Sequence, residues 1–197
     1  MSGIYDEEYY NSDNYEEYIV RGRTTNHYQI MADETMDILK KLNRPVDTVL
    51  DFGCAVGFLA KELQRHSNIV HGVDVSSWAR EEAKKRGIEV TEEPHYDNEY
   101  DVVYALDVLE HLNEDELQTF MENINTETFV YKLPVCHEND GPYVLDCAES
   151  DSTHKIRWTK DSWVDFFGYY GYFCVDLNTT NIYASEGGFC GIAFKQI

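Results

Sequence analysis

The sequence predicts an α/β fold with a mostly parallel sheet. Short apolar runs rich in β-branched residues alternate with segments of helical period through five units. After the first of these runs, a turn of small residues leads directly into a helix. The 197 residues are enough for one domain with a substantial core, and no internal repeat is present. We therefore expect a single α/β domain over residues 1–197.

The stretch from Val46 to Phe58 is the centre of this prediction. Its apolar run is too short for a helix and predicts a buried strand that ends at Asp51. A tight turn follows, and helical spacing begins at Phe58. In the turn, Gly53 can adopt a backbone conformation closed to other residues. Ala55 and Gly57 leave space for a ligand against the main chain, beside the N–H groups of the helix N-terminus.

Two familiar nucleotide-binding motifs are excluded for this turn. A dinucleotide fingerprint needs glycine at the third and sixth positions, where this chain has Ala55 and Phe58. A P-loop needs a G-K-[ST] sequence, which does not follow here. The turn has instead an acid two residues before Gly53 and the spacing D-x-G-x-A-x-G.

The elements around this unit can be predicted in order. A helix is expected over residues 24–42, and a second strand over 69–75 with Asp74 at its end. Ser76 and Ser77 start a helix that Gly87 stops. Short strands follow at 88–90 and 101–104. A capping box of Asn113 and Glu116 begins the next helix.

The last third of the chain contains a long loop and a strand pair. A strand over 129–133 ends at Pro134, and residues 134–157 show little periodicity. A loop of that length in a compact domain usually has a function. An aromatic helix starts near Thr159, and the segments 172–175 and 189–194 predict an antiparallel pair at the sheet edge.

Three of these segments, in this order and spacing, resemble the class I S-adenosylmethionine-dependent methyltransferases. The turn after Asp51 resembles their motif I, in which a second glycine more often stands at the position of Ala55. Asp74 lies 23 residues after Asp51 (74 − 51), the length of one strand–helix–strand unit. The segment YDVVYALDVLEHL, residues 100–112, resembles their fourth strand and the loop after it. The resemblance implies a Rossmann-like three-layer sandwich with a seven-stranded, mostly parallel sheet and an antiparallel edge pair.

The resemblance also implies S-adenosylmethionine as cofactor and S-adenosylhomocysteine as product. Asp74 is expected to accept hydrogen bonds from both ribose hydroxyls and, as a strand-end acid, to lie near solvent. An acid after the third strand is expected at the adenine amino group, with Glu92, Glu93 and Asp97 all open as candidates. The expected cofactor-binding residues are Asp51, Gly53, Cys54, Ala55, Gly57, Phe58, Asp74, Val75, Glu92, Glu93, Leu106 and Asp107. Cys54 is expected to be a small packed residue there and no nucleophile.

Three histidines are the candidates for catalysis. Methyl transfer needs a general base only if the acceptor must lose a proton. His154, in the loop before the aromatic helix, is the first candidate by position and by the usual pKa of imidazole. His137 and His111 come next. A structural role is the alternative for each, and for His111 a packing or capping role is favoured.

Residues 1–23 form an acidic segment rich in tyrosine. Disordered tails are poor in aromatic residues, so we expect this segment to fold over the cofactor cleft. The alternative is that its tyrosines pack on the outside of the sheet.

Composition limits the location and the partners of the chain. The formal net charge is −21, from 37 acids and 16 bases, which makes nucleic acid an unfavourable substrate. No signal core or membrane-spanning run appears, so a cytoplasmic location is expected. Five scattered cysteines without C-x-x-C spacing indicate neither a zinc site nor a disulfide framework, and no metal is expected. The oligomeric state is left open.

Together these features predict a methyltransferase that acts on a small molecule, such as a sugar or another hydroxyl compound. No Asn-Pro-Pro-Tyr motif follows the fourth strand, which disfavours methylation of adenine N6 or glutamine. The alternative from another class is a catalytically silent cofactor-binding or protein-interaction module on the same fold. Binding of cofactor without turnover of any acceptor would favour that alternative.

Overall fold

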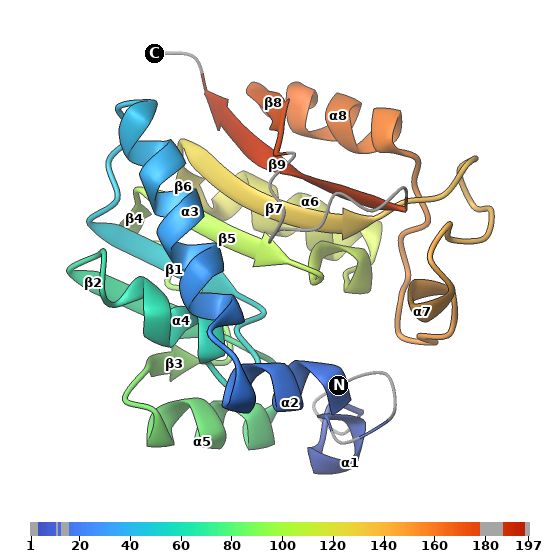
Figure 1. The fold of residues 1–197 in the computed structure, drawn as a ribbon. Helices are drawn as coiled ribbons and strands as arrows, with labels where there is room; N and C mark the ends of the chain where they lie inside the picture. Colours follow the sequence, from blue (N-terminus) through green and yellow to red (C-terminus); the bar gives the residue numbers. More distant parts are fainter. Residues whose placement is uncertain (1–3, 11, 13–15, 178–186, 196–197) are drawn as a thin grey trace. The chain divides into compact units, whose positions relative to one another are not determined.

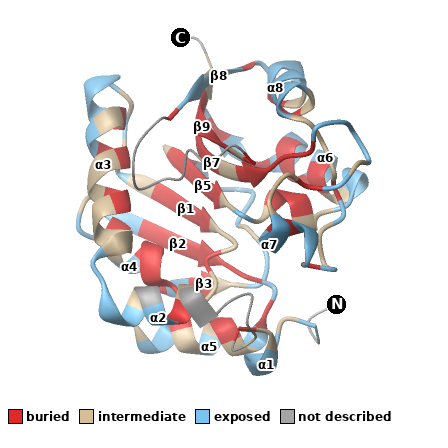
Figure 2. Ribbon diagram, turned by 45° about the vertical axis from the view of Figure 1, so that its right-hand side comes forward, coloured by how far each residue is buried: buried red, intermediate tan, exposed pale blue. Residues whose placement is uncertain are grey.

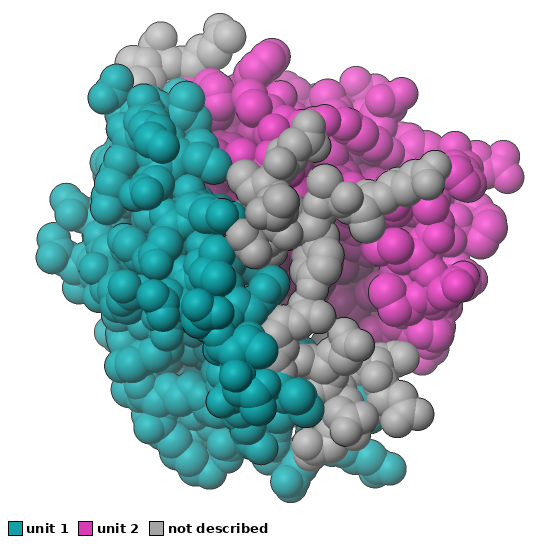
Figure 3. All heavy atoms as spheres, in the orientation of Figure 1, with its two compact units in different colours: residues 1–103 teal, residues 104–197 magenta. Residues whose placement is uncertain are grey.

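The computed structural model describes residues 4–10, 12, 16–177 and 187–195 of the chain. Contacts divide the chain into two compact units, residues 1–103 and residues 104–197 (Figure 3). Seven strands form one sheet in the order β3-β2-β1-β5-β7-β9-β8, as drawn in Figure 1. This order and the strand directions confirm the predicted fold class. The prediction of a single domain stays a prediction.

The first unit contains three parallel strands and five helices. β1 (Thr48–Phe52) pairs with β2 (Ile69–Val73), which pairs with β3 (Glu89–Thr91). The helices are α1 (Glu7–Tyr10), α2 (Glu16–Thr24), α3 (His27–Lys41), α4 (Phe58–Leu63) and α5 (Ser77–Lys85). The helix expected over residues 24–42 is therefore α3, and its first predicted residue belongs to α2. The start of α5 is as predicted, because the side chain of Ser76 accepts a hydrogen bond from the Ala79 N–H.

β5 (Val102–Leu106) crosses the boundary between the units. The second unit continues with the 3-10 turn η1 (Leu109–His111), α6 (Glu114–Asn123), β7 (Thr128–Pro134), α7 (Asp146–Glu149), α8 (Lys160–Tyr169), β8 (Tyr172–Asp176) and β9 (Gly188–Lys195). The predicted capping box of Asn113 and Glu116 is present at the start of α6. β9 pairs antiparallel with both β7 and β8, which confirms the predicted pair at the sheet edge. The sequence did not predict the two-residue strands β4 (Glu99–Tyr100) and β6 (Asn125–Thr126), which pair with each other.

Each unit has a buried core around its strands (Figure 2). In the first, Val49 and Leu50 of β1 are fully buried. In the second, the rings of Phe129 and Tyr131 on β7 pack against Phe167 of α8, at centroid distances of 5.9 and 5.0 Å. Full burial of one such side chain contributes about 1.5–3 kcal/mol to folding. Both units therefore have a rigid base for the turns that follow their strands.

None of the helices in the described residues is both long enough and apolar enough to cross a membrane.

Candidate functional site

The turn after β1 is tied to the end of β2 by its main chain. The N–H groups of Gly53 and Cys54 both donate to the carbonyl oxygen of Val73, at 2.8 and 2.9 Å. The turn needs left-handed backbone at three positions, with φ of 76° at Gly53, 46° at Ala55 and 81° at Gly57. Alanine reaches such angles at a cost of about 1–2 kcal/mol, so the rest of the turn has to hold Ala55 in place.

Asp74 is the residue that holds Ala55. Its Oδ2 accepts the N–H of Ala55 at 2.8 Å, and its Oδ1 accepts the N–H of Ser76 at 2.8 Å. The hydroxyl of Tyr10 lies 3.5 Å from Oδ2. Asp74 is only 7% exposed, so the expectation of a carboxylate near solvent was wrong: the N-terminal segment and its own turn cover it. Burial raises the pKa of Asp74, and the two N–H donors oppose this shift.

Asp51 ends β1 with a carboxylate that is only partly satisfied. The residue is 4% exposed, and none of the described residues forms a hydrogen bond with its Oδ2. Burial raises the pKa of Asp51 to about 7, against a hydrogen bond from the Ala60 main chain that lowers it, and Asp74 adds to the rise. A buried carboxylate oxygen without a partner fits a cationic ligand. S-adenosylmethionine has both a sulfonium and an ammonium group, so the residues present fit that cofactor.

The tyrosine-rich segment packs against this turn and the start of α5. The rings of Tyr10 and Trp78 stack with centroids 5.4 Å apart. Tyr10 and Ile19 share an apolar cluster with Val56, Phe58 and Ala79. The segment thus covers side chains of the predicted cofactor turn, whereas a role as a cover of the cofactor itself stays a prediction.

Phe58 and Cys54 are packed residues in this unit. The ring of Phe58 stacks on Tyr28 at 5.6 Å, and the guanidinium of Arg86 lies 4.5 Å from its centroid. Phe58 also lines a cavity of about 520 Å³ beside the α2–α3 connection, whose lining includes no other predicted cofactor residue. Cys54 is buried, and burial raises the pKa of its thiol, as expected for a packed residue and not for a nucleophile.

The predicted residues further along the first unit are more exposed. Val75 is 47% exposed. Glu92 is also exposed and forms an ion pair with Arg80 at 3.1 Å, and Arg80 donates in addition to the main-chain oxygen of Asp74 at 2.7 Å. Glu93 is exposed, and its main-chain oxygen accepts a hydrogen bond from Thr91. Of the two acids, Glu92 is therefore the one that is linked through Arg80 to Asp74, the residue expected at the ribose.

The end of β5, in the second unit, presents the last two predicted cofactor residues. Leu106 is half-buried and Asp107 is exposed. Asp107 has a φ of 51°, donates its N–H to the main-chain oxygen of Lys132 at 2.8 Å, and pairs with the Lys132 ammonium. This pair fixes the direction of the chain as it enters η1.

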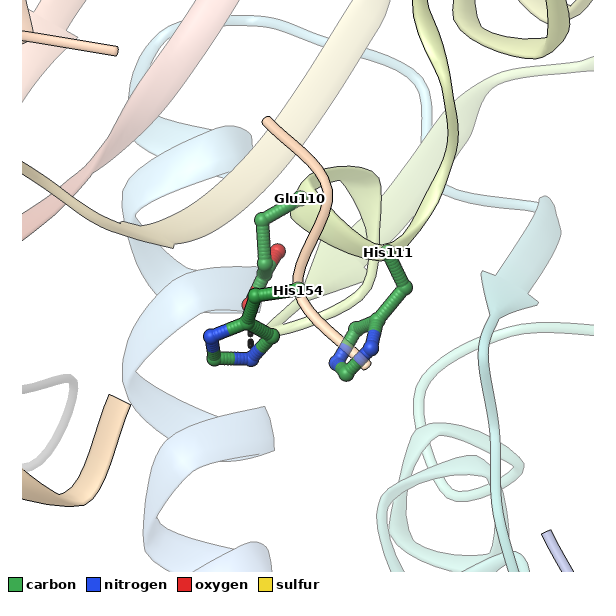
Figure 4. A group of neighbouring side chains, drawn as sticks. All are labelled: Glu110, His111 and His154. Carbon is green, nitrogen blue, oxygen red and sulfur yellow. Dashed lines mark ion pairs between the residues drawn. The ribbon is translucent and has the colours of Figure 1, made fainter. Parts of the chain in front are cut away.

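η1 and the loop after α7 form a cluster of three side chains in the second unit. The main-chain oxygen of Glu110 accepts two N–H groups of the loop, from Lys155 at 2.8 Å and from Ile156 at 3.0 Å. This pair of bonds places His154 next to Glu110 and His111 (Figure 4). The rings of His111 and His154 lie 4.5 Å apart at 70°. One potential ligand atom of each of the three side chains lies within 4.8 Å of the other two.

Neighbouring oxygens fix the protonated nitrogen of both imidazoles. Nδ1 of His154 lies 2.9 Å from the main-chain oxygen of Ala148, which can only accept, so Nδ1 bears the proton. The Thr153 hydroxyl donates to Asp151 at 2.6 Å, so it accepts from Nδ1 of His111 at 2.8 Å. In both rings Nε2 is therefore the nitrogen with the lone pair.

Burial disfavours the charged form of each group in this cluster. It lowers the pKa of His111 to about 4, with the neighbouring His154 adding to the shift, and it lowers the pKa of His154 as well. Burial also raises the pKa of Glu110 well above its usual range, and Asp107 adds to the rise. The side chain of Glu110 is 1% exposed, and within the described residues neither carboxylate oxygen has a hydrogen-bond partner. Its closest imidazole nitrogen, Nε2 of His154, is 3.9 Å away and beyond hydrogen-bond distance.

The structure thus brings together two of the three predicted catalytic histidines. His137 is exposed in the loop after β7 and does not belong to the cluster. The sequence analysis did not assign site roles to Glu110, Thr153 and Asp151. The available signals were the pair Glu110-His111 after a strand and the segment D-S-T-H, residues 151–154, in an aperiodic loop. Neither signal shows that the two segments are in contact.

Comparisons with known proteins agree with this geometry. A family model described as a methyltransferase domain matches residues 23–128. Among curated proteins, no significant match was found. Magnesium protoporphyrin IX methyltransferase from Synechocystis PCC 6803, solved with bound S-adenosylmethionine, is similar in structure with a TM-score of 0.63 and 17% identity, over 96% of this chain and 94% of that one.

Two further solved structures share the fold. An S-adenosylmethionine-dependent methyltransferase from Clostridium acetobutylicum gives a TM-score of 0.65 at 11% identity, over 92% of this chain and 98% of that one. The methyltransferase domain of bacterial CtHen1-C gives 0.59 at 21% identity, over 87% of this chain and 100% of that one. With the family match over residues 23–128 and the motif turn after β1, these findings place the chain in a family: it belongs to the methyltransferase domain family and is a class I S-adenosylmethionine-dependent methyltransferase.

Proposed function

We propose that the protein transfers the methyl group of S-adenosylmethionine to an oxygen of a small hydroxyl compound, such as a sugar. The buried cluster after β5 is the observation that supports this proposal. It combines an imidazole nitrogen with a lone pair, Nε2 of His154, and a carboxylate without partners, Glu110. The imidazole nitrogen is a group that can accept the proton of a hydroxyl.

The residues of the first unit are proposed to bind the cofactor. Asp74 accepts the ribose hydroxyls, because a carboxylate with two N–H donors still has lone pairs for further bonds. Asp51 faces the positive charge of the cofactor with its unpartnered oxygen. When bound, the cofactor supplies an electrophilic methyl group on a sulfonium. The chain has to align the acceptor with that methyl group and exclude water.

His154 is proposed as the general base of the reaction. As the acceptor oxygen bonds to the methyl carbon and the carbon–sulfur bond breaks, the hydroxyl proton goes to Nε2 of His154. The Ala148 carbonyl holds the ring through Nδ1 and keeps Nε2 available for this proton. The neutral form that burial favours is the form that can accept it.

The charge of the chain supports a small acceptor over a nucleic acid. A net charge of −21 repels a phosphate backbone, whereas an uncharged sugar is not affected. A polyanionic acceptor would need a local basic surface to overcome this repulsion.

An assay with methyl-labelled S-adenosylmethionine tests the proposal. The purified chain is incubated with separate panels of sugars, phenols, primary amines and an RNA oligonucleotide, and the label in each product is measured. We expect label in a hydroxyl compound. Label confined to the oligonucleotide or the amines would contradict the proposed acceptor class. Cofactor binding without label in any panel would favour the silent-module alternative.

A further inference from the structure

The buried carboxylate of Glu110 indicates a ligand that is not part of the chain. Both of its oxygens lie in the interior, and neither has a hydrogen-bond partner among the residues that the structure describes. Leaving a buried polar group unsatisfied costs about 1–3 kcal/mol, and more for a charged one. A side chain that served packing alone would be replaced by an apolar residue at no such cost. The position of Glu110 is therefore explained best by a partner that arrives from outside.

The two histidines beside Glu110 are oriented in the way that metal-binding histidines are. Such histidines nearly always donate the N–H of the other ring nitrogen to a main-chain carbonyl, a carboxylate or a hydroxyl, which fixes the tautomer and the ring plane. His154 donates to the carbonyl oxygen of Ala148. His111 donates to Thr153, whose hydroxyl is held by Asp151. The support of His154 comes from α7 and that of His111 from the loop directly after it, so one short segment, residues 148–153, orients both imidazoles.

We propose that Glu110, His111 and His154 bind a divalent transition-metal cation through one carboxylate oxygen and the two Nε2 atoms. Two imidazoles and a carboxylate match the donor preference of zinc, cobalt and iron, and not that of magnesium or calcium, which take oxygen ligands. Three protein ligands leave at least one coordination position of the cation open. The prediction of no metal, made from the cysteines alone, did not consider this donor set.

The spacing of the three side chains is close to that of a bound site. Two ligands at about 2.1 Å from one cation lie at most about 4.2 Å apart. The candidate ligand atoms here lie within 4.8 Å of one another, so a pair at that limit has to approach by about 1.4 Å to reach the separation of about 3.4 Å between ligands of a tetrahedral cation. Small rotations of the side chains on η1 and the loop are enough for this. The bonds from Lys155 and Ile156 to the Glu110 main chain keep the two segments together meanwhile.

A cation here would also give the acceptor a docking point, an extension that rests on the proposed function. A hydroxyl oxygen can occupy the open position. In that case Nε2 of His154 is a ligand, and the hydroxyl proton leaves to solvent instead of to His154. The base role and the ligand role of this nitrogen are therefore mutually exclusive, and metal binding decides between them.

Direct titration tests the metal site without cofactor or acceptor. The full chain is stripped with a chelator and titrated with Zn²⁺, Co²⁺ and Mg²⁺ by calorimetry. We expect one Zn²⁺ or Co²⁺ per chain and binding at least about tenfold weaker for Mg²⁺. The visible spectrum with Co²⁺ should lack a thiolate charge-transfer band, because all ligands are nitrogen or oxygen. Absence of stoichiometric binding, or a thiolate band, would overturn the proposal.

Variants connect the binding to the three residues. Glu110→Gln and His154→Gln keep the size of the side chain and should lower affinity at least about 100-fold, and Thr153→Val, which removes the support of His111, about 10–100-fold. Glu114→Gln changes an exposed acid of the same unit and should stay within about twofold. Unchanged affinity in both ligand variants would contradict the site. If those variants do not fold, X-ray absorption of the zinc-loaded wild type still decides, since it should show imidazole and oxygen ligands only.

The result also separates this inference from the proposed function. Metal binding at the cluster without methyl transfer to any hydroxyl compound would support the metal site and contradict the proposed acceptor class. If the chain binds no cation and methyl transfer persists in the presence of a chelator, the metal site is contradicted and the role of His154 as general base is supported.

Discussion

Two buried carboxylates, one in each unit, are used in opposite ways. Asp74, after β2, accepts one main-chain N–H on each oxygen, from Ala55 and Ser76. Glu110, after β5, accepts no hydrogen bond on either oxygen from the part of the chain that the structure describes. Their burial is similar, at 7% and 1% exposed. The difference shows that the Asp74 carboxylate shapes its turn before any ligand binds, whereas the Glu110 carboxyl group makes no hydrogen bond to the described residues and is available to a ligand.

The largest expected effect concerns the second unit. His154→Gln removes Nε2 as base or ligand and should lower the turnover number about 10²–10⁴-fold, since this is what general acid–base catalysis contributes. The affinity for S-adenosylhomocysteine should stay near the wild-type value, measured by calorimetry, because His154 is not one of the proposed cofactor-binding residues. Turnover within a factor of three of wild type would refute a catalytic role of His154. Glu114→Gln is the matched control.

The next effect concerns stability and pH through Asp51. Its carboxyl loses its proton near pH 3.9 in the unfolded chain and near pH 7 in the folded one, so the folded state holds an extra proton between these values. Stability should therefore fall as pH rises from about 4 to 7, by up to about 1.4 kcal/mol per pH unit, and level off above.

Asp51→Asn isolates this effect from the general repulsion of a chain with net charge −21. Denaturant unfolding at several pH values should show that the wild type loses more stability than the variant between pH 5 and 7. Parallel curves for the two proteins would show that Asp51 does not titrate in this range.

Asp74 is expected to give a smaller effect on binding and a cost in stability. Asp74→Ala removes the acceptor of the ribose hydroxyls and should weaken cofactor binding by about 1.5–3 kcal/mol per charged hydrogen bond lost. It also leaves the Ala55 and Ser76 N–H groups without their acceptor, so the melting temperature should fall as well. Calorimetry and thermal unfolding measure the two effects. Wild-type affinity in a folded Asp74→Ala protein would exclude the ribose role.

The smallest effect is expected at Tyr10. Its hydroxyl lies 3.5 Å from Asp74, at the limit of a hydrogen bond, while its ring stacks on Trp78. Tyr10→Phe keeps the ring and should change stability by no more than about 0.5 kcal/mol, whereas Tyr10→Ala should cost several times more. Equal losses in the two variants, by denaturant unfolding, would show that the hydroxyl and not the ring anchors the segment.

The comparison also shows what sequence could predict here. The site around Asp74 lies within local strand–turn–helix units, and local patterns place its acids at strand ends. Burial of Asp74 by Tyr10 depends on a contact between residues 64 positions apart, which no local pattern shows. The cluster of the second unit depends on contacts of the same kind, such as that of Thr153 with His111 at a separation of 42. The individual histidines could therefore be named as candidates, but their common site with Glu110 could not.

The steady-state kinetics of Asp74→Ala and His154→Gln, measured together in the labelled-methyl assay, test most directly the division into a cofactor-binding unit and a chemical unit. We predict that Asp74→Ala raises the KM for S-adenosylmethionine at least about tenfold and retains most of kcat at saturating cofactor. We predict that His154→Gln lowers kcat and leaves the cofactor KM near wild type. The reverse pattern, or a loss of kcat alone in both variants, would contradict the account.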